Sequence, residues 1–398
     1  MDFALNEEQR MLQDSAAAWF AARAAADRHA RRAGGQAPAT DEWSEFAKMG
    51  WLALCLPEEF GGFGGGPLEI LVLMEAFGRA GAVGPFVSTA VIGARAITRY
   101  GTGEQRRDLL SRAARGDLRF AAALYEDPAG CRPAAISTRA VPCDGGYVLN
   151  GEKPCVFDAA SAGKILVAAR VAGAGAGDGA LGFFLVDRAA PGLEARPFER
   201  LDGGHASHLR FADVRVGEAE RIGAACSGDE CLADLTNAAL AALCAEAVGT
   251  MQALHDLTLE YLKVRKQFGR PIGQFQVLQH RQVDMLVALE QARSIVMAAC
   301  MALAEGLPEA HRLLSMAKIT VGRAGRTVAH GAVQLHGGMG MTDELEVGRR
   351  FKRLAVIDTQ FGSSDERIRM LAGVRGGGGT PGAAASPGTT QPKRERNS

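Results

Sequence analysis

The sequence changes character twice along its length, and this alternation constrains the fold more than any single motif. Residues 1–117 are rich in Ala, Leu, Glu and Arg, with apolar residues three and four positions apart, which predicts an N-terminal α-helical domain. Over 118–220, short β-type runs such as KILVAARV and LGFFLVD alternate with Gly, Asp and Pro, which predicts a central antiparallel β-barrel or sandwich. Longer helical periodicity over 221–373 predicts an antiparallel helix bundle. We therefore predict an α+β multidomain fold, followed by a Gly- and Pro-rich disordered tail at 374–398.

Composition excludes several classes of partner and site. The 398 residues carry 45 Lys+Arg and 45 Asp+Glu, so no overall field favours nucleic acid. The N-terminus lacks a secretory signal pattern, and we expect no apolar run long enough to span a bilayer. We therefore expect a cytoplasmic protein without membrane insertion. The eight cysteines form no C-x-x-C pair and are expected to be reduced thiols. His205 and His208 lack a nearby third ligand, so we predict no metal site.

The first long helix of the bundle ends in YLKVRKQFGRPIGQFQ, residues 261–276. The basic residues of this segment have an ordinary structural explanation, because cations at a helix C-terminus offset the exposed carbonyl dipoles. The following glycine and proline are likewise explained, because they end the helix. That account leaves Gln267, Phe268 and Gln276 unexplained. Together with Arg265 they combine a bidentate cation, amides and an aromatic ring, which suits a phosphate beside a flat ring system.

The third long helix ends in QLHGGMGMTD, residues 334–343, which allows two interpretations. Gly337 and Gly338 can cap the helix, and their lack of side chains also lets another molecule's phosphates approach the backbone. Taken alone, this segment and the preceding one are each explained by helix capping.

Taken together, the segments RKQFGRPIGQFQ, QLHGGMG and LPEEFGG resemble the acyl-CoA dehydrogenase family over residues 1 to about 373. The resemblance implies a three-domain flavoprotein that binds FAD and removes hydrogens from the α and β carbons of an acyl-CoA thioester. It also implies reoxidation by an electron-transfer flavoprotein. The family residues that hold the FAD pyrophosphate and adenosine correspond to Arg265, Gln267, Phe268, Gln276, Gln334, Gly337 and Gly338, and Ser363 stands at a further cofactor-binding position.

The flavin half of the family pattern matches less well. In the segment LYEDPAGCRP, Tyr125 stands where the family has a threonine that touches the flavin, and no Ser-Asp pair follows. In CVFDAA, Phe157 stands at a second such threonine position. Each change removes a small hydroxyl donor and adds an aromatic ring, so we expect crowding where the flavin would lie.

The expected catalytic base is also replaced. Phe361 stands at the usual glutamate position, and Ala239 at the position that a second group of members uses. Glu246 is the sole charged residue between Thr236 and Leu254, which makes it the candidate substitute base. It lies two helical turns from Ala239, roughly 10 Å along the axis. The alternative is a buried glutamate paired with an arginine of the bundle, for which the candidates are Arg293, Arg323 and Arg326.

The complete pattern is most similar to the small subunits of two-component acyl-CoA dehydrogenases, such as the pimeloyl-CoA dehydrogenase type. In those α2β2 heterotetramers one chain carries the base and most of the flavin site, while the small subunit completes the FAD pocket. Two alternatives stay open: a self-sufficient, homo-oligomeric dehydrogenase that uses an atypical base such as Glu246, and a non-catalytic scaffold that keeps the fold. Nothing in the sequence distinguishes the acyl group of the substrate.

Overall fold

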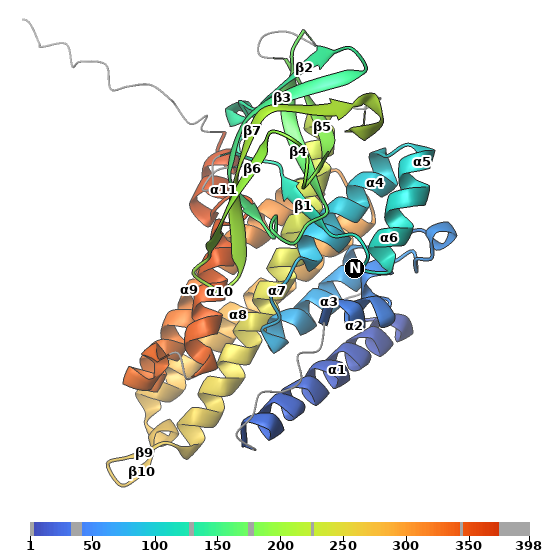
Figure 1. Ribbon diagram of the computed structural model, residues 1–398. Helices are drawn as coiled ribbons and strands as arrows, with labels where there is room; N and C mark the ends of the chain where they lie inside the picture. The colour runs from blue at the N-terminus through green and yellow to red at the C-terminus, as the bar shows by residue number, and fades with distance from the viewer. Residues whose placement is uncertain are drawn as a thin grey trace, which may run out of the picture.

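The computed structural model describes residues 4–32, 42–126, 131–173, 179–223, 227–342 and 345–373. The predicted tail at 374–398 therefore lies outside the described residues. Figure 1 shows a β-sheet domain at one end, long helices running away from it, and the N-terminal helices along one side of those helices. The predicted order of a helical domain, a β domain and a helix bundle is confirmed.

The N-terminal domain is helical, and its first three α-helices are α1 (Glu7–Arg32), α2 (Glu42–Lys48) and α3 (Pro67–Ala80). They are followed by a π-helical turn at Val87–Gly93, α4 (Ala94–Tyr100), α5 (Gly103–Gln105), a second π-helical turn at Arg106–Leu110, and α6 (Ser111–Ala114). The domain packs against the first bundle helix mainly through α3 and the π-helical turn that follows it, while α1 packs on α3. α3 begins with proline at its first turn, and Glu69 accepts a hydrogen bond from the backbone N–H of Gly66 at 2.7 Å, which caps the helix.

Glycines set the close crossing of α3 with the first bundle helix, α7 (Gly228–Val264). A Cβ atom at Gly78 would lie 1.9 Å from the Glu246 carbonyl oxygen, and one at Gly249 would lie 1.9 Å from the Glu75 carbonyl oxygen. No side chain fits at either position without moving a backbone. Gly78 and Gly249 therefore allow the two helices to touch backbone to backbone, and this crossing fixes the position of Glu246 on α7.

The central domain is one eight-stranded sheet. Its strands are β1 (Phe120–Ala123), β2 (Arg139–Cys143), β3 (Gly146–Phe157), β4 (Lys164–Val171), β5 (Ala180–Asp187), β6 (Leu193–Glu199), β7 (His205–Gly217) and β8 (Arg221–Ile222). The hydrogen-bonded order is β6-β7-β3-β2-β4-β5-β8, with β1 paired to β4. The expectation of a wholly antiparallel domain is wrong in one respect, because β4 runs parallel to both β1 and β2. β8 extends the sheet two residues past position 220.

The C-terminal bundle contains the three long helices that periodicity predicts. They are α7, α8 (Gln276–Ala304) and α9 (Ala310–His336), followed by α10 (Glu346–Thr359) and α11 (Ser364–Leu371). By length and composition α7 and α8 are apolar enough to cross a bilayer, contrary to the sequence expectation. In α7 that apolar window is 83% buried inside the protein, whereas in α8 it is 39% buried. α7 is therefore a core helix, while α8 leaves much of its apolar face uncovered.

The cysteines depart in part from expectation. Cys55, Cys131, Cys143, Cys155, Cys244 and Cys300 are free. Cys231 is disulfide-bonded, so the expectation of reduced thiols throughout is wrong at this position. Within the described ranges, no group of three or more His, Cys, Asp or Glu side chains could hold a metal ion.

Candidate functional site

Most of the predicted cofactor-binding residues lie at the end of the bundle farthest from the sheet (Figure 1). After α7, the chain forms a short hairpin of β9 (Lys266–Gln267) and β10 (Arg270–Pro271). Arg265 and Gln267 are exposed there, and Phe268 at the tip is 90% exposed with φ of 52°. Gln276 is exposed at the start of α8. A large ring held out into solvent on a left-handed residue is not explained by packing within this chain.

The second predicted segment lies at the same end of the bundle. The rings of Tyr261 on α7 and His336 on α9 stack with centroids 4.3 Å apart, which joins the two helix ends. Gly337 caps α9 with φ of 62°, which confirms the capping interpretation. Gln334, Gly337 and Gly338 are exposed, and a Cβ atom at either glycine would meet nothing within 4 Å. The glycines therefore leave open surface beside the C-terminal end of α9, where no side chain blocks the approach of a ligand to the backbone.

Ser363 has a different setting from the other predicted cofactor residues. Its hydroxyl accepts a hydrogen bond from the backbone N–H of Glu366 at 3.3 Å and caps α11. A role of Ser363 toward a cofactor stays a prediction.

The two positions that the family uses for its base lie in one apolar cluster. Ala239 is fully buried, and Phe361 and Tyr125 pack against the same cluster. The rings of Tyr125 and Phe361 meet edge to face with centroids 6.4 Å apart, and the Tyr125 hydroxyl bonds the Thr236 hydroxyl at 2.8 Å. Where a carboxylate would be expected, the chain therefore packs apolar side chains.

Phe361 keeps an unusual backbone conformation. Its φ is 53°, which costs on the order of 1 to 2 kcal/mol for a residue with a side chain. Arg367 donates from Nη2 to the Phe361 carbonyl oxygen at 2.6 Å, and the fully buried Lys318 donates to the carbonyl oxygens of Gln360, at 2.9 Å, and of Ile357. Two buried cations thus hold this loop by its backbone, independently of the Phe361 side chain.

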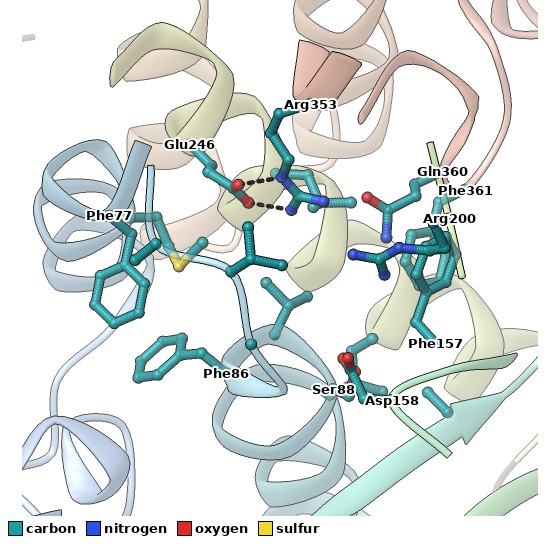
Figure 2. A pocket seen from close by; sticks show the side chains of 18 residues that line it. Phe77, Phe86, Ser88, Phe157, Asp158, Arg200, Glu246, Arg353, Gln360 and Phe361 are labelled. Carbon is teal, nitrogen blue, oxygen red and sulfur yellow. Dashed lines mark hydrogen bonds and ion pairs between the residues drawn. The ribbon is translucent and has the colours of Figure 1, made fainter. Parts of the chain in front are cut away.

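Glu246 and Phe361 both line a small cavity of about 40 Å³ between the N-terminal helices, the sheet and the bundle. Figure 2 shows the Glu246–Arg353 pair at the top of the cavity, Arg200 at the right, Asp158 at the bottom, and the rings of Phe77 and Phe86 at the left. A buried water occupies roughly 10 to 15 Å³ of such volume, so the cavity holds about three waters. Neither an acyl thioester nor a flavin ring fits into this space.

Glu246 is 3% exposed and is bound by Arg353 of α10 through two hydrogen bonds, Nε to Oε1 at 2.5 Å and Nη2 to Oε2 at 2.7 Å (Figure 2). The expectation of a buried ion pair is confirmed, but the candidate partners were wrong. Arg323 and Arg326 lie on exposed positions of α9, and Arg293 pairs with Glu75 instead.

The ion pair continues as a chain of alternating charges. Arg353 also donates from Nη1 to Asp202 at 2.8 Å, and Arg200 binds Asp202 from Nε at 3.0 Å and from Nη2 at 3.1 Å. Burial alone would raise the pKa of Asp202, but Arg200 and Arg353 hold it below its ordinary value. Burial likewise acts against the charge of Arg353, but Glu246 and Asp202 keep its pKa raised. Hydrogen bonds therefore join the side chains of Glu246, Arg353, Asp202 and Arg200 into one continuous chain.

Phe157, at the second flavin-threonine position, is covered by the Arg200 guanidinium at 4.4 Å from the ring centroid. The next residue, Asp158, has φ of 60° and accepts a hydrogen bond from the Ser88 hydroxyl at 3.0 Å. Burial raises the pKa of Asp158. Arg200 and Arg353 act against this rise through space, so Asp158 is a cavity carboxylate that faces two arginines at longer range. Nothing in the sequence distinguishes it, because it is one of many aspartates after a strand.

Sequence reasoning also missed Arg353, Arg200 and Asp202. Arg353 lies in the basic run GRRFKR, where nothing separates a buried arginine from its exposed neighbours. The signal that could have identified it is the helical period: Arg350, three residues earlier, and Leu354 and Ile357 are buried on one face of α10.

Comparisons with known proteins follow the same division into three parts. The sequence matches the family models described as the N-terminal, middle and C-terminal domains of acyl-CoA dehydrogenase over residues 6–117, 121–214 and 234–374. Among curated relatives it is 28% identical over 379 residues to a probable acyl-CoA dehydrogenase of Bacillus subtilis, YngJ, covering 94% of this chain and 99% of that protein. It is 30% identical over 349 residues to an L-prolyl-[peptidyl-carrier protein] dehydrogenase of Serratia, covering 85% and 89%.

Several solved structures have the same fold as this chain. The Tcur3481-Tcur3483 steroid ACAD has a chain with 33% identity and a TM-score of 0.80, covering 92% of this chain and 97% of that one. The ChsE4-ChsE5 complex of Mycobacterium tuberculosis has a chain with 25% identity and a TM-score of 0.81, covering 94% and 98%. The FAD complex of PigA has 27% identity and a TM-score of 0.83, covering 94% and 100%.

Proposed function

Because the chain belongs to the acyl-CoA dehydrogenase family of FAD-dependent oxidoreductases, we propose that it is the small subunit of a two-component acyl-CoA dehydrogenase. In this proposal a homologous large subunit holds the flavin ring and the base, and the present chain completes the site for the rest of the cofactor. The substrate is an acyl-CoA thioester, and the electron acceptor is an electron-transfer flavoprotein, as the family resemblance implies.

The observation that carries the proposal is the state of Glu246. A positioned base contributes about 10²- to 10⁴-fold in rate, roughly 3 to 5 kcal/mol of barrier. Glu246 has both carboxylate oxygens bound by Arg353, so accepting a proton would break a buried ion pair. Asp158 faces a cavity with room for a few waters and none for a thioester. These contacts argue against the self-sufficient alternative.

The fit to FAD differs between the two ends of the molecule. At the bundle end, Arg265, Gln267 and Phe268 offer a cation, an amide and an exposed ring that meets Phe275 edge to face, and Gly337 and Gly338 leave open backbone. These residues fit a pyrophosphate and an adenine. At the sheet end, aromatic rings and the charged chain from Glu246 to Arg200 fill the space, which does not fit a flavin ring. In this proposal, hydride transfer therefore does not take place in this chain's own cavity.

The surface supports a protein partner. α8 exposes Val277 (63%), Val283 (55%), Leu286 (39%) and Val287 (51%). At the bundle end, Val264 (70%), Met341 (77%) and Phe268 (90%) are exposed as well. Exposed apolar surface of this kind marks a site of association. Charged residues such as Arg281 and Asp284 are exposed on the same helix, which favours a protein over a lipid surface as its cover.

The bundle end can be tested in the assembled enzyme. In the complex with the large subunit, Arg265→Ala should lower the flavin retained after gel filtration by about tenfold, because it removes a cation from the pyrophosphate. The matched control is Arg115→Ala, which removes an exposed arginine of the N-terminal domain and should leave the flavin content unchanged. If Arg265→Ala keeps full flavin content and activity, the bundle end does not hold the cofactor.

A further inference from the structure

A second cavity, of about 160 Å³, lies between the N-terminal helices and the bundle. It is lined by Ala238 and Ala241 of α7, whereas Leu243 and Glu246 of the same helix line the cavity described above. At about 100° per residue, these two pairs lie on different faces of α7. The second cavity is therefore separate from the Glu246 site.

The walls of this cavity are mainly apolar. They are formed by Ile70, Ala90, Val91, Ala238, Ala241 and Leu303. A cavity of about 150 Å³ with such walls accepts a molecule of the size of benzene. The volume therefore suits one aromatic ring or a short aliphatic chain.

One turn of α4 places three polar side chains on the cavity: Arg95, Thr98 and Arg99. Arg95 binds Asp234 through Nε at 2.8 Å and Nη2 at 2.6 Å, so its charge is neutralised. Arg99 lies 3.6 Å from the same carboxylate, and its side chain is 53% exposed. Two guanidinium groups thus share one aspartate, which leaves Arg99 with donors for another anion.

Thr98 adds a second unused polar group. Its hydroxyl oxygen is buried and has no hydrogen-bond partner within the described part of the chain. A buried polar atom without a partner is costly, and rotation of the Thr98 side chain toward the cavity would let a ligand oxygen satisfy it.

The remaining polar groups narrow the type of ligand. Burial raises the pKa of the Cys55 thiol to about 12, so this lining residue is not a thiolate for a metal or an electrophile. Glu69 lies close by but does not line the cavity, and it is engaged by the Gly66 backbone N–H at 2.7 Å and by Gln9 at 2.8 Å. The cavity therefore combines apolar walls with hydrogen-bond donors from Arg99 and Thr98, which suits a ligand that carries both an apolar group and an acceptor.

We propose that this cavity binds a small monocarboxylic acid, with an aryl or short aliphatic group against the apolar walls. The carboxylate accepts hydrogen bonds from the Arg99 guanidinium and the Thr98 hydroxyl. The inference is independent of the proposed subunit role, because it uses no residue of the FAD or Glu246 sites.

The probe is 4-fluorobenzoate, titrated into the full chain and followed by fluorine NMR, with 4-fluorobenzamide as the uncharged analogue. We expect saturable binding of the acid and at least tenfold weaker binding of the amide, since a charged hydrogen bond is lost. Equal binding of the two probes, or no saturable binding of the acid, would overturn the proposal.

Three variants locate the site. Arg99→Gln alters a half-exposed side chain, so the fold should be kept, and it should weaken binding of the acid about tenfold. Thr98→Val should weaken binding of the acid by a smaller factor. Ala241→Met should fill the cavity, so that neither 4-fluorobenzoate nor 4-fluorobenzamide binds. Arg115→Gln is the control and should bind as the natural chain does. Unchanged affinity in Arg99→Gln would by itself contradict the assignment.

Discussion

Arg353 of α10 donates hydrogen bonds to both carboxylate oxygens of Glu246 on α7, at 2.5 and 2.7 Å. The two residues lie 107 positions apart in the sequence. Both are almost fully enclosed, with side-chain exposures of 13% and 3%. Both residues line the small cavity between the N-terminal helices, the sheet and the bundle.

Arg353→Met should destabilise the protein strongly. It leaves Glu246 and Asp202 as buried carboxylates without their shared cation, and such a loss costs about 3 to 5 kcal/mol. Urea unfolding of the full chain measures it. The control Arg323→Met removes an exposed arginine of α9 and should stay within about 0.5 kcal/mol of the natural chain. A loss below about 1 kcal/mol in Arg353→Met would show that the pair is not the buried contact described.

Glu246→Gln separates a structural role from a catalytic one. In the assembled two-subunit enzyme, kcat and its pH profile should stay within about twofold of the natural complex, while the melting temperature falls because a buried ion pair is broken. The opposite pattern, a loss of about 10² or more in kcat at an unchanged melting temperature, would identify Glu246 as the base.

A buried pair in the sheet domain gives a pH prediction. Glu126 accepts hydrogen bonds from Ser137 and Thr138 and pairs with the fully buried Lys153 at 3.2 Å. Burial acts to raise the pKa of Glu126, but Lys153 and these donors lower it to about 2. The unfolded chain, with its ordinary pKa near 4.5, therefore binds more protons between these values. Stability from this group is fully present above pH 4.5 and is lost as the pH falls toward 2.

Glu126→Gln should remove this contribution. At pH 7 the variant should lose roughly 2 to 3 kcal/mol of unfolding free energy, and the two curves should converge as the pH approaches 2. The control is Glu152→Gln, an exposed carboxylate of β3, which should leave the pH dependence almost unchanged. Parallel curves for the natural chain and Glu126→Gln would contradict the prediction.

The uncovered face of α8 predicts an effect on assembly. Val287→Asp places a charge on the exposed apolar surface, so it should weaken association with the partner at least tenfold while the isolated chain keeps its melting temperature. Sedimentation velocity of the mixed subunits measures this. Val141→Asp changes a similarly exposed valine, 45% against 51%, on the sheet domain, and it should assemble normally. Equal weakening by both variants would argue against α8 as the contact face.

Sequence reasoning located the long helices well because their apolar periodicity extends over many turns, and it paired the ends of α7 and α9 through family motifs. It could not find the partner of Glu246. That pairing depends on how closely α3, α7 and α10 approach, which is set by contacts such as those at Gly78 and Gly249. The same limit applies to the parallel pairing of β4 with β1 and β2, because strand order is decided by tertiary contacts and not by local propensity.

The sequence indicated that aromatic rings would crowd the cavity, but it could not indicate how much volume would remain. Tyr125 and Phe157 in place of threonines indicated crowding, and the structure places Arg200 over Phe157 as well. The remaining volume depends on side-chain rotamers contributed by all three parts of the chain, which no local pattern encodes.

The most direct test of the subunit role is the visible absorption spectrum of the purified chain, alone and after reconstitution with a homologous large subunit and FAD. The account predicts a colourless chain alone, and a yellow complex that oxidises acyl-CoA when the two subunits are combined. A chain that purifies alone as a yellow homo-oligomer and oxidises acyl-CoA would contradict it.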